Sequence, residues 1–203
     1  EVPGIDRFIG LGQLSPELLI WCWENHRLPV SVDMISFGRN AWSAIRSQTP
    51  HLLEKFIKTA PTNQPLPHMI EALKRHHAEL PAPNTGLGLT QHLTLQIIHD
   101  HGPLSIGKVF SHLMQTYDPL PFLGDLMFWA NVQQMMECQD PLFTITPDNA
   151  DQNAPHQNWA KQTITHTQTG KATLAGKPNF VENFTGIRWV GGIKVVGHGS
   201  KTA

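Results

Sequence analysis

The stretch from Asp118 to Cys138 constrains the fold of this chain most strongly. It opens with a double-proline turn and continues with apolar residues on nearly every side of a helical wheel. No Lys or Arg lies between Tyr117 and Pro141. A helix that is apolar all round is buried in a structure or between two domains. We therefore predict one long helix over residues 118–138, packed on its own domain on one side and on a second domain or a partner on another.

The N-terminal part of the chain carries the signals of a helical bundle. Ser or Thr followed by Pro is a strong helix start, because the hydroxyl oxygen caps free amides while Pro at the first helical position loses no hydrogen bond. Apolar residues at helical spacing follow each start. Residues 81–88, rich in turn formers, then mark a boundary. We predict a bundle over residues 1–85, whose helices begin at Ser15-Pro16, Ser31, Thr49-Pro50 and about Met69.

The second part of the chain mixes helices with short strands. Thr90 and Ser105 are predicted to cap two helices, and the apolar stretch supplies a third. Alternating residues predict a strand pair at 142–146 and 162–166, joined by a long polar loop. A short helix over 167–175 follows, and then either two short strands separated by Gly191-Gly192 or one strand with a bulge there. The predicted fold class is mainly α with a small β component: the N-terminal bundle, then a winged-helix-like domain with C-terminal strands over residues 86–203.

The amino-acid composition limits the classes of protein to which this chain can belong. Of the 203 residues, 40% are hydrophobic and 15% are charged, which excludes a disordered tail or a fibrous repeat. The longest apolar runs are far shorter than the roughly 20 residues that cross a bilayer, so we expect no membrane partner. Cys22 and Cys138 lie in predicted helices among bulky apolar neighbours, as reduced thiols do in a cytosolic core. No segment reads as a signal peptide, and the expected location is the cytoplasm.

The order helix, helix, helix, strand, loop, strand, closed by Ile164–Leu174, resembles a winged helix-turn-helix module of bacterial regulators over residues 88–176. The resemblance implies a third helix that presents cationic and amide side chains to DNA. Residues 88–176 instead carry 3 Lys/Arg against 7 Asp/Glu. Because affinity for DNA comes mostly from counterion release by cations, nucleic-acid binding through the third helix is disfavoured. The polar wing or the basic tail, Lys177–Lys201, is the alternative nucleic-acid surface.

Four motifs in order resemble the C-terminal half of a bacterial family of unknown function. They span almost the whole chain, although the ending Gly197–Ala203 lacks the aromatic residues of the family. The resemblance implies a helical, winged-helix-like half of a two-domain protein, whose separate N-terminal domain this sequence does not include. It implies no established activity. The motifs are Ile5–Glu17, Arg39–Arg46 followed by Thr49-Pro50, Pro121–Trp129 and Gly186–Gly192.

The residue types that carry most enzyme chemistry are not spaced for it. Among the twelve histidines, His76-His77 are adjacent and His99 and His101 are two apart, so neither pair has the i, i+4 geometry of a helical zinc site. The chain has no Cys-x-x-Cys pair, nucleophile elbow, phosphate-binding glycine loop or dinucleotide fingerprint. We therefore predict no catalytic residue, no metal ligand and no cofactor.

The first candidate binding cluster lies in the second predicted helix. Arg39, Trp42 and Arg46 are spaced at i, i+3 and i+7, so one helical face carries two guanidinium groups beside an indole. Such a face suits an anion, an acidic partner or an unstacked base. The alternative is that these arginines form ion pairs inside the bundle, with Glu17, Glu24 or Asp33 as partners.

Arg188-Trp189, beside Gly191-Gly192, forms the second candidate binding cluster. Its alternative is a strand that closes the sheet with the Trp side chain in the core. Asp125 lies in the first turns of the long helix. We expect its carboxylate to interact with the positive end of that helix and not to act in catalysis, because no base or nucleophile is paired with it.

These features favour a non-enzymatic interaction or regulatory module. The expected partner is the missing N-terminal domain or another protein chain. The alternative is a transcription-regulator-like nucleic-acid binder that uses the wing or the basic tail, and a third possibility is half of an enzyme whose chemistry lies in the other domain. The predicted packing seam or interface along the apolar stretch comprises Phe122, Asp125, Phe128, Trp129 and Val132.

Overall fold

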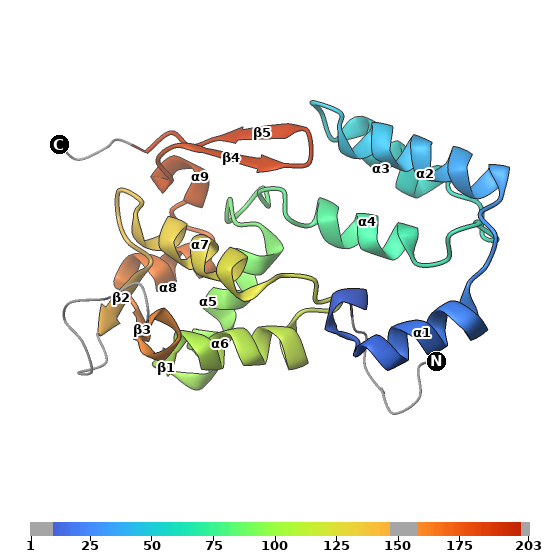
Figure 1. The fold of residues 1–203 in the computed structure, drawn as a ribbon. Helices are drawn as coiled ribbons and strands as arrows, with labels where there is room; N and C mark the ends of the chain where they lie inside the picture. The colour runs from blue at the N-terminus through green and yellow to red at the C-terminus, as the bar shows by residue number, and fades with distance from the viewer. Residues whose placement is uncertain (1–9, 147–157, 200–203) are drawn as a thin grey trace.

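The computed structural model describes residues 10–146 and 158–199. The described chain is mainly helical with two small antiparallel sheets, as the sequence predicts. Figure 1 shows the N-terminal helices grouped at one side of the molecule and the C-terminal elements at the other. The N-terminal helices are η1 (Leu11–Gln13), α1 (Pro16–His26), α2 (Val32–Ile45), α3 (His51–Thr59) and α4 (Met69–His77).

The N-terminal helices enclose a small core. Helix α2 packs on α3, and α3 packs on α4. The aromatic rings of Phe37 and Phe56 meet there with centroids 5.1 Å apart. Helix α1 has no buried residue, so it does not take part in this core. We call the buried set the bundle core; it comprises Ala41, Ala44, Leu53, Ile70 and Leu73.

The C-terminal half begins with helices and ends with strands. A three-stranded sheet has the order β1-β3-β2, and a separate hairpin pairs β4 with β5. The elements are α5 (Leu89–His101), β1 (Leu104–Ser105), α6 (Ile106–His112), the π-helical turn η2 (Leu113–Tyr117), α7 (Asp125–Met136), β2 (Phe143–Thr146), η3 (Trp159–Lys161), β3 (Thr163–His166), α8 (Gln168–Leu174), α9 (Phe180–Asn183), β4 (Ile187–Val190) and β5 (Ile193–Val196).

Both predicted strand pairs are confirmed. Ile145 of β2 lies opposite Ile164 of β3, and Ile164 also faces Leu104 of β1. The sequence does not reveal β1, because a strand of two residues is too short to show an alternating pattern. The predicted loop between β2 and β3 lies mostly at 147–157, outside the described residues.

The predicted helix starts at Ser15, Ser31 and Thr167 are confirmed, whereas the predicted caps at Thr49 and Thr90 are wrong. The hydroxyl oxygens of Ser15 and Ser31 accept hydrogen bonds from backbone amides in the first turns of α1 and α2, at 3.3 and 3.1 Å. Helix α3 begins one residue after Pro50, which replaces Thr49 as its cap. Helix α5 begins at Leu89 after a Gly cap, so Thr90 lies inside the helix, where its hydroxyl binds Glu79.

The predicted helix over 118–138 is too long, because α7 covers only Asp125–Met136. The backbone at Asp118 is extended, as expected for a residue that precedes proline. Its side chain is also buried, and one carboxylate oxygen accepts the amide hydrogen of Leu120 at 3.0 Å. The double-proline segment is therefore a fixed loop ahead of α7.

A large core lies between α5, α6, α7 and the three-stranded sheet. Helix α7 contributes Phe128, Val132 and Met135, all fully buried. The rings of Phe110 and Phe128 meet with centroids 5.2 Å apart. We call this set the C-terminal core; it also includes Leu95, Ile97, Ile106, Val109, Leu113, Leu142, Phe143, Ile164, Phe180 and Phe184.

The β4–β5 hairpin connects the two halves. Its turn reaches the end of α2, where the Gly192 amide donates to the Ile45 carbonyl at 2.8 Å (Figure 1). Gly191 has φ +57°, a conformation that side-chain-bearing residues rarely adopt. A Cβ at Gly192 would overlap the carbonyl oxygens of Arg46 and Ser47. The Gly-Gly pair is therefore needed both for the turn and for its close approach to α2.

No helix within the described residues has the length and apolar character to cross a membrane.

Candidate interaction site

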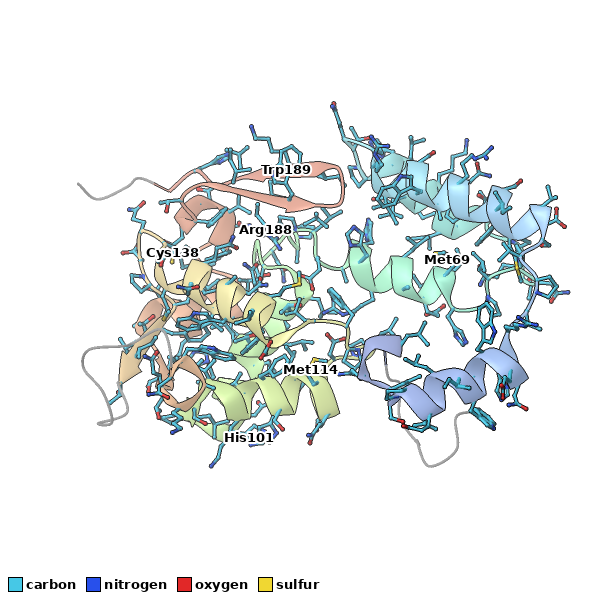
Figure 2. All side chains as sticks on the ribbon, viewed as in Figure 1. Met69, His101, Met114, Cys138, Arg188 and Trp189 are labelled. Atoms are coloured by element: carbon cyan, nitrogen blue, oxygen red, sulfur yellow. The ribbon has the colours of Figure 1, made fainter. Side chains whose placement is uncertain are left out.

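A cavity of about 290 Å³ opens where the two halves meet. It lies between the end of α4, the loop before α7, one side of α7 and strand β4. We call it the junction groove. Figure 2 labels Arg188 and Trp189, which reach it from β4. Its lining residues are His76, Glu79, Phe122, Leu123, Met127, Ala130, Asn131, Gln134, Arg188, Trp189 and Val190.

A buried ionic network lies beside the junction groove and reaches its lining through Glu79. The guanidinium of Arg75, on α4, donates two hydrogen bonds to the Asp118 carboxylate, at 2.8 and 2.6 Å. It donates a third to Glu79 at 2.6 Å and a fourth to the hydroxyl of Thr90 at 2.9 Å. Arg75 and Asp118 are only 5% and 7% exposed, so the charge pair is shielded from water and its geometry is fixed.

The network compensates the charges it buries. Burial would lower the pKa of Arg75, but its hydrogen bonds to Asp118 and Glu79 outweigh burial and raise that pKa. The Arg75 guanidinium also lies over the ring of Phe122, with 5.0 Å between its central carbon and the ring centroid. The network thus fixes the position of one apolar wall of the junction groove.

Arg188 joins the hairpin to α4. One of its terminal nitrogens donates to the backbone carbonyl of Glu79 at 3.0 Å, and the other lies 3.8 Å from the Glu79 carboxylate. Burial lowers the pKa of Arg188, and Glu79 opposes that effect. The sequence predicts that Arg188 binds a ligand, but its guanidinium already has Glu79 as a partner within the chain.

The rim of the junction groove is apolar and open to solvent. Phe122, Met127 and Trp189 are 53%, 60% and 61% exposed. The sequence alternative that puts Trp189 in the core is therefore wrong, because in the β4–β5 register Trp189 pairs with Lys194 on the open side of a two-stranded sheet. Gln134, deeper in the groove, has a buried side-chain oxygen without a hydrogen-bond partner among the described residues.

The residues of the predicted seam separate into two faces of α7. Phe128 and Val132 are fully buried in the C-terminal core, as predicted. Trp129 is half-buried and stacks on Trp159, with ring centroids 5.7 Å apart. Phe122, in the loop before α7, lies at the junction groove instead.

The outer face of α7 does not fit the prediction of a helix buried on all sides. Leu126 and Met127 are 68% and 60% exposed, so the chain itself does not bury this face, and its burial against a partner stays a prediction. Asp125 is also exposed, and its carboxylate accepts the amide hydrogen of Leu126 at 2.8 Å, within the first turn. That contact confirms the expected role of Asp125 at the positive end of the helix.

The Arg39, Trp42 and Arg46 cluster lies on the exposed face of α2, away from the lining of the junction groove. The Arg46 guanidinium sits 5.9 Å from the Trp42 ring centroid, and Trp42 is 58% exposed. Within the described part of the chain, neither arginine forms an ion pair, so the alternative pairing with acidic residues of α1 and α2 is wrong. The backbone of Arg46 lies beside Gly192 of the hairpin turn, where an added Cβ would overlap the Arg46 carbonyl oxygen.

Sequence reasoning missed the ionic network. Arg75 and Glu79 are four residues apart on one helix, and this spacing is a visible sign of a possible ion pair. Asp118 is 43 residues from Arg75, so no local pattern connects the two.

The described residues show neither a metal-binding cluster nor an activated cysteine. Among residues 10–146 and 158–199, no three His, Cys, Asp or Glu side chains are placed to share a metal ion. Cys22 and Cys138 are free thiols, and burial raises the pKa of Cys138 to about 11, which disfavours the reactive thiolate. No protein-family model matches the chain, and no curated protein or solved structure matches it either.

Proposed function

We propose that the chain is a non-enzymatic interaction or regulatory module of a larger bacterial protein, and that its junction groove binds an apolar segment of a protein. The observation that carries this proposal is the exposed apolar rim, formed by Phe122, Met127 and Trp189, with the Phe122 ring held against the buried Arg75 guanidinium. Solvent-exposed apolar groups that gather at a groove mark interaction sites. Trp, Phe and Met are also enriched at protein interfaces.

A winged-helix-like fold is part of this proposal. The order α5, β1, α6, α7, β2, β3 and the sheet order β1-β3-β2 support it. In winged-helix regulators, the third helix presents its outer face to DNA. Here the corresponding helix, α7, carries no Lys or Arg and exposes Leu126 and Met127. An apolar outer face favours a protein surface over the phosphate backbone of DNA as the ligand.

The proposed occupant is a polypeptide outside this chain. The family that the sequence resembles places a separate domain before this half, and that domain is our first candidate. A different protein chain is the second. The resemblance to that bacterial family is itself part of the proposal and rests on the four sequence motifs.

Photo-crosslinking tests the proposal directly. In the full-length parent protein, p-benzoylphenylalanine replaces Met127 at the groove rim or, as a control, Lys108 on the exposed side of α6. We expect a specific polypeptide adduct from position 127 only, mapped by mass spectrometry to one segment and lost when Trp189→Asp is added. Absence of an adduct at 127, or an equal adduct at 108, would overturn the proposal.

A nucleic-acid role has one observation in its favour. Two exposed tryptophans carry arginines over their rings: Arg27 lies 4.8 Å from the ring centroid of Trp23, and Arg46 lies 5.9 Å from that of Trp42. Such pairs can stack on an unpaired base. Lys177 and Lys194 of the basic tail are also exposed, whereas the wing lies outside the described residues.

This second candidate predicts salt-dependent binding. A mobility-shift series with random duplex and single-stranded DNA measures it, and the slope against salt counts the phosphates contacted. Trp42→Ala should weaken single-strand binding, with Leu52→Ala on α3 as the exposed control. If neither DNA form binds at any salt concentration, the nucleic-acid role is wrong.

A further inference from the structure

A second cavity, of about 630 Å³, lies in the C-terminal half, between α5, β3 and α8. Its lining shares no residue with the junction groove. Its volume falls within the range of about 300–1,000 Å³ typical of small-molecule sites. We call it the α5–α8 pocket.

The lining of the α5–α8 pocket combines apolar walls with basic nitrogens. Ile98 and Leu174 face it from α5 and α8. His99, His166 and Lys171 contribute an imidazole, a second imidazole and an ammonium group, and the described lining contains no Asp or Glu. The pocket therefore offers one ammonium group and two imidazole rings beside an apolar surface, which is the complement of an amphipathic anion.

The acidic group nearest in sequence to the lining, Asp100, is already engaged by other side chains. Asp100 follows His99 directly, but its two carboxylate oxygens accept hydrogen bonds from the Tyr117 hydroxyl, at 2.8 Å, and from the Gln96 amide, at 2.7 Å. Gln96 itself lines the pocket. The hydrogen bonds from Tyr117 and Gln96 lower the pKa of Asp100, and nearby His99 lowers it further, so this carboxylate offsets charge on His99 but not on Lys171. The Lys171 side chain has no ion-pair partner among residues 10–146 and 158–199, and it is exposed.

His166 is positioned by the backbone. One ring nitrogen, Nε2, lies 2.8 Å from the carbonyl oxygen of Leu95. Because a carbonyl only accepts, Nε2 carries the proton and the other nitrogen, Nδ1, has no proton in the neutral ring. Nδ1 is buried and has no partner among the described residues. Burial lowers the pKa of His166, the Leu95 carbonyl opposes this, and nearby His99 and Lys171 lower the pKa further.

We infer that the α5–α8 pocket binds a small monocarboxylate with an aliphatic body, whose carboxylate pairs with Lys171 and His99 while its chain packs on Ile98 and Leu174. The single ammonium group of Lys171 matches a single negative charge. A phosphate-rich ligand calls for the several donors or arginines that such sites use, and the lining has no Arg. The apolar walls give the ligand's chain a surface to bury.

Octanoate is the probe for this pocket. Its binding to the unmodified chain is measured by calorimetry and by the NMR signals of methyl groups. Saturable binding should shift the methyl signals of Ile98 and Leu174 without shifting that of Met127 in the junction groove. Octanol, which has the chain without the charge, and inorganic phosphate, which has charge without the chain, should each bind at least about tenfold more weakly. Equal binding of either one would overturn the inference.

Two exposed lysines supply the matched variants. Lys171→Gln removes the pocket cation and should weaken octanoate binding about fivefold or more, as expected for one partly exposed charge pair. Lys108→Gln, on α6, should leave the affinity unchanged. Unchanged melting temperatures would show that both variants fold. Affinity unaffected by Lys171→Gln would contradict the site, and this test does not depend on any partner at the junction groove.

Discussion

The two halves of the molecule bury their apolar side chains to very different extents. The C-terminal core includes large residues from α5, α6, α7 and the three-stranded sheet, with Phe128 and Phe143 at most 2% exposed. The bundle core consists of five residues, two of them alanines, within the described chain. Helix α1 adds nothing to it and leaves Ile20 and Trp23 59% and 65% exposed. The N-terminal half therefore depends more on contacts outside itself.

Polar contacts join the unequal halves. Arg75 binds Asp118, Arg188 binds the Glu79 carbonyl, and the Gly192 amide binds the Ile45 carbonyl. These bonds fix the relative position of α4, the loop before α7 and the hairpin without filling the space between them with apolar side chains. The junction between the halves is therefore a groove held by polar contacts, and Leu123 of the C-terminal core forms part of its lining.

The largest expected effect separates the two faces of α7. Phe128→Lys places an unpaired charge in the C-terminal core and should cost at least about 4 kcal/mol, with Val132→Lys close behind. Leu126→Lys, two residues earlier on the outer face, should change stability by less than about 0.5 kcal/mol. Urea unfolding followed by circular dichroism measures all three. A Phe128→Lys variant as stable as the Leu126→Lys variant would remove the distinction between the faces.

Matched truncations compare the two cores themselves. Leu113→Ala, in the C-terminal core, should cost about 4 kcal/mol, because a large packed core relaxes little around a cavity. Leu53→Ala, in the bundle core, should cost about 2 kcal/mol, because a thin core collapses more easily. Hydrogen exchange should show that Leu53→Ala exposes amides of α2 and α3 while α5–α7 stay protected. Equal costs with global exchange in both variants would show a single cooperative core.

Breaking the link between the halves should have the next largest effect. Asp118→Asn leaves the buried Arg75 charge without its main partner and should cost about 3 kcal/mol. Glu71→Gln removes the partner of Lys74 in an exposed pair on the same helix and should cost between zero and about 1 kcal/mol. Chemical denaturation measures both. If the two costs agreed, the buried network would not hold the halves together.

The smallest expected effect is a dependence of stability on pH, which arises from one histidine in each half, His76 and His166. Burial lowers the folded-state pKa of His76 and of His166 below the ordinary 6.5, so the unfolded chain binds more protons at acid pH. Their contribution to stability is complete above about pH 6.5 and is lost as the pH falls below it. Urea midpoints at pH 7.5 and 5.5 should show this loss, and the double variant His76→Gln, His166→Gln should reduce it. An undiminished pH effect in that variant would assign it to other groups.

Much of the architecture follows from local patterns in the sequence. Ser15 and Ser31 predict their helices because a hydroxyl cap acts on amides only two or three residues away. Ile145 and Ile164 alternate with polar residues, and this period of two predicts the β2–β3 pair. These features depend on neighbours in the sequence, so they can be read without a structure.

The candidate site could not be predicted in the same way. The apolar character of the stretch around α7 correctly places Phe128 and Val132 in the core, but it does not say that Met127 stays uncovered. The exposure of Met127 and Trp189 depends on where α4 and the hairpin end relative to α7. That arrangement is set by Arg75, Asp118 and Arg188, whose contacts span distances in sequence over which no pattern acts.

The most direct test of the central claim measures whether the junction groove is covered in the protein's working context. Hydroxyl-radical footprinting reads the oxidation rates of Met127 and Trp189 in this chain alone and in the proposed longer parent protein, with Trp42 on α2 as the reference in both samples. We predict that Met127 and Trp189 oxidise rapidly in the chain alone and are protected at least about fivefold in the parent, relative to Trp42, as burial of a rim by a standard interface requires. Equal rates in the two samples, under conditions where the parent is intact and folded, would contradict the claim that a polypeptide occupies the groove.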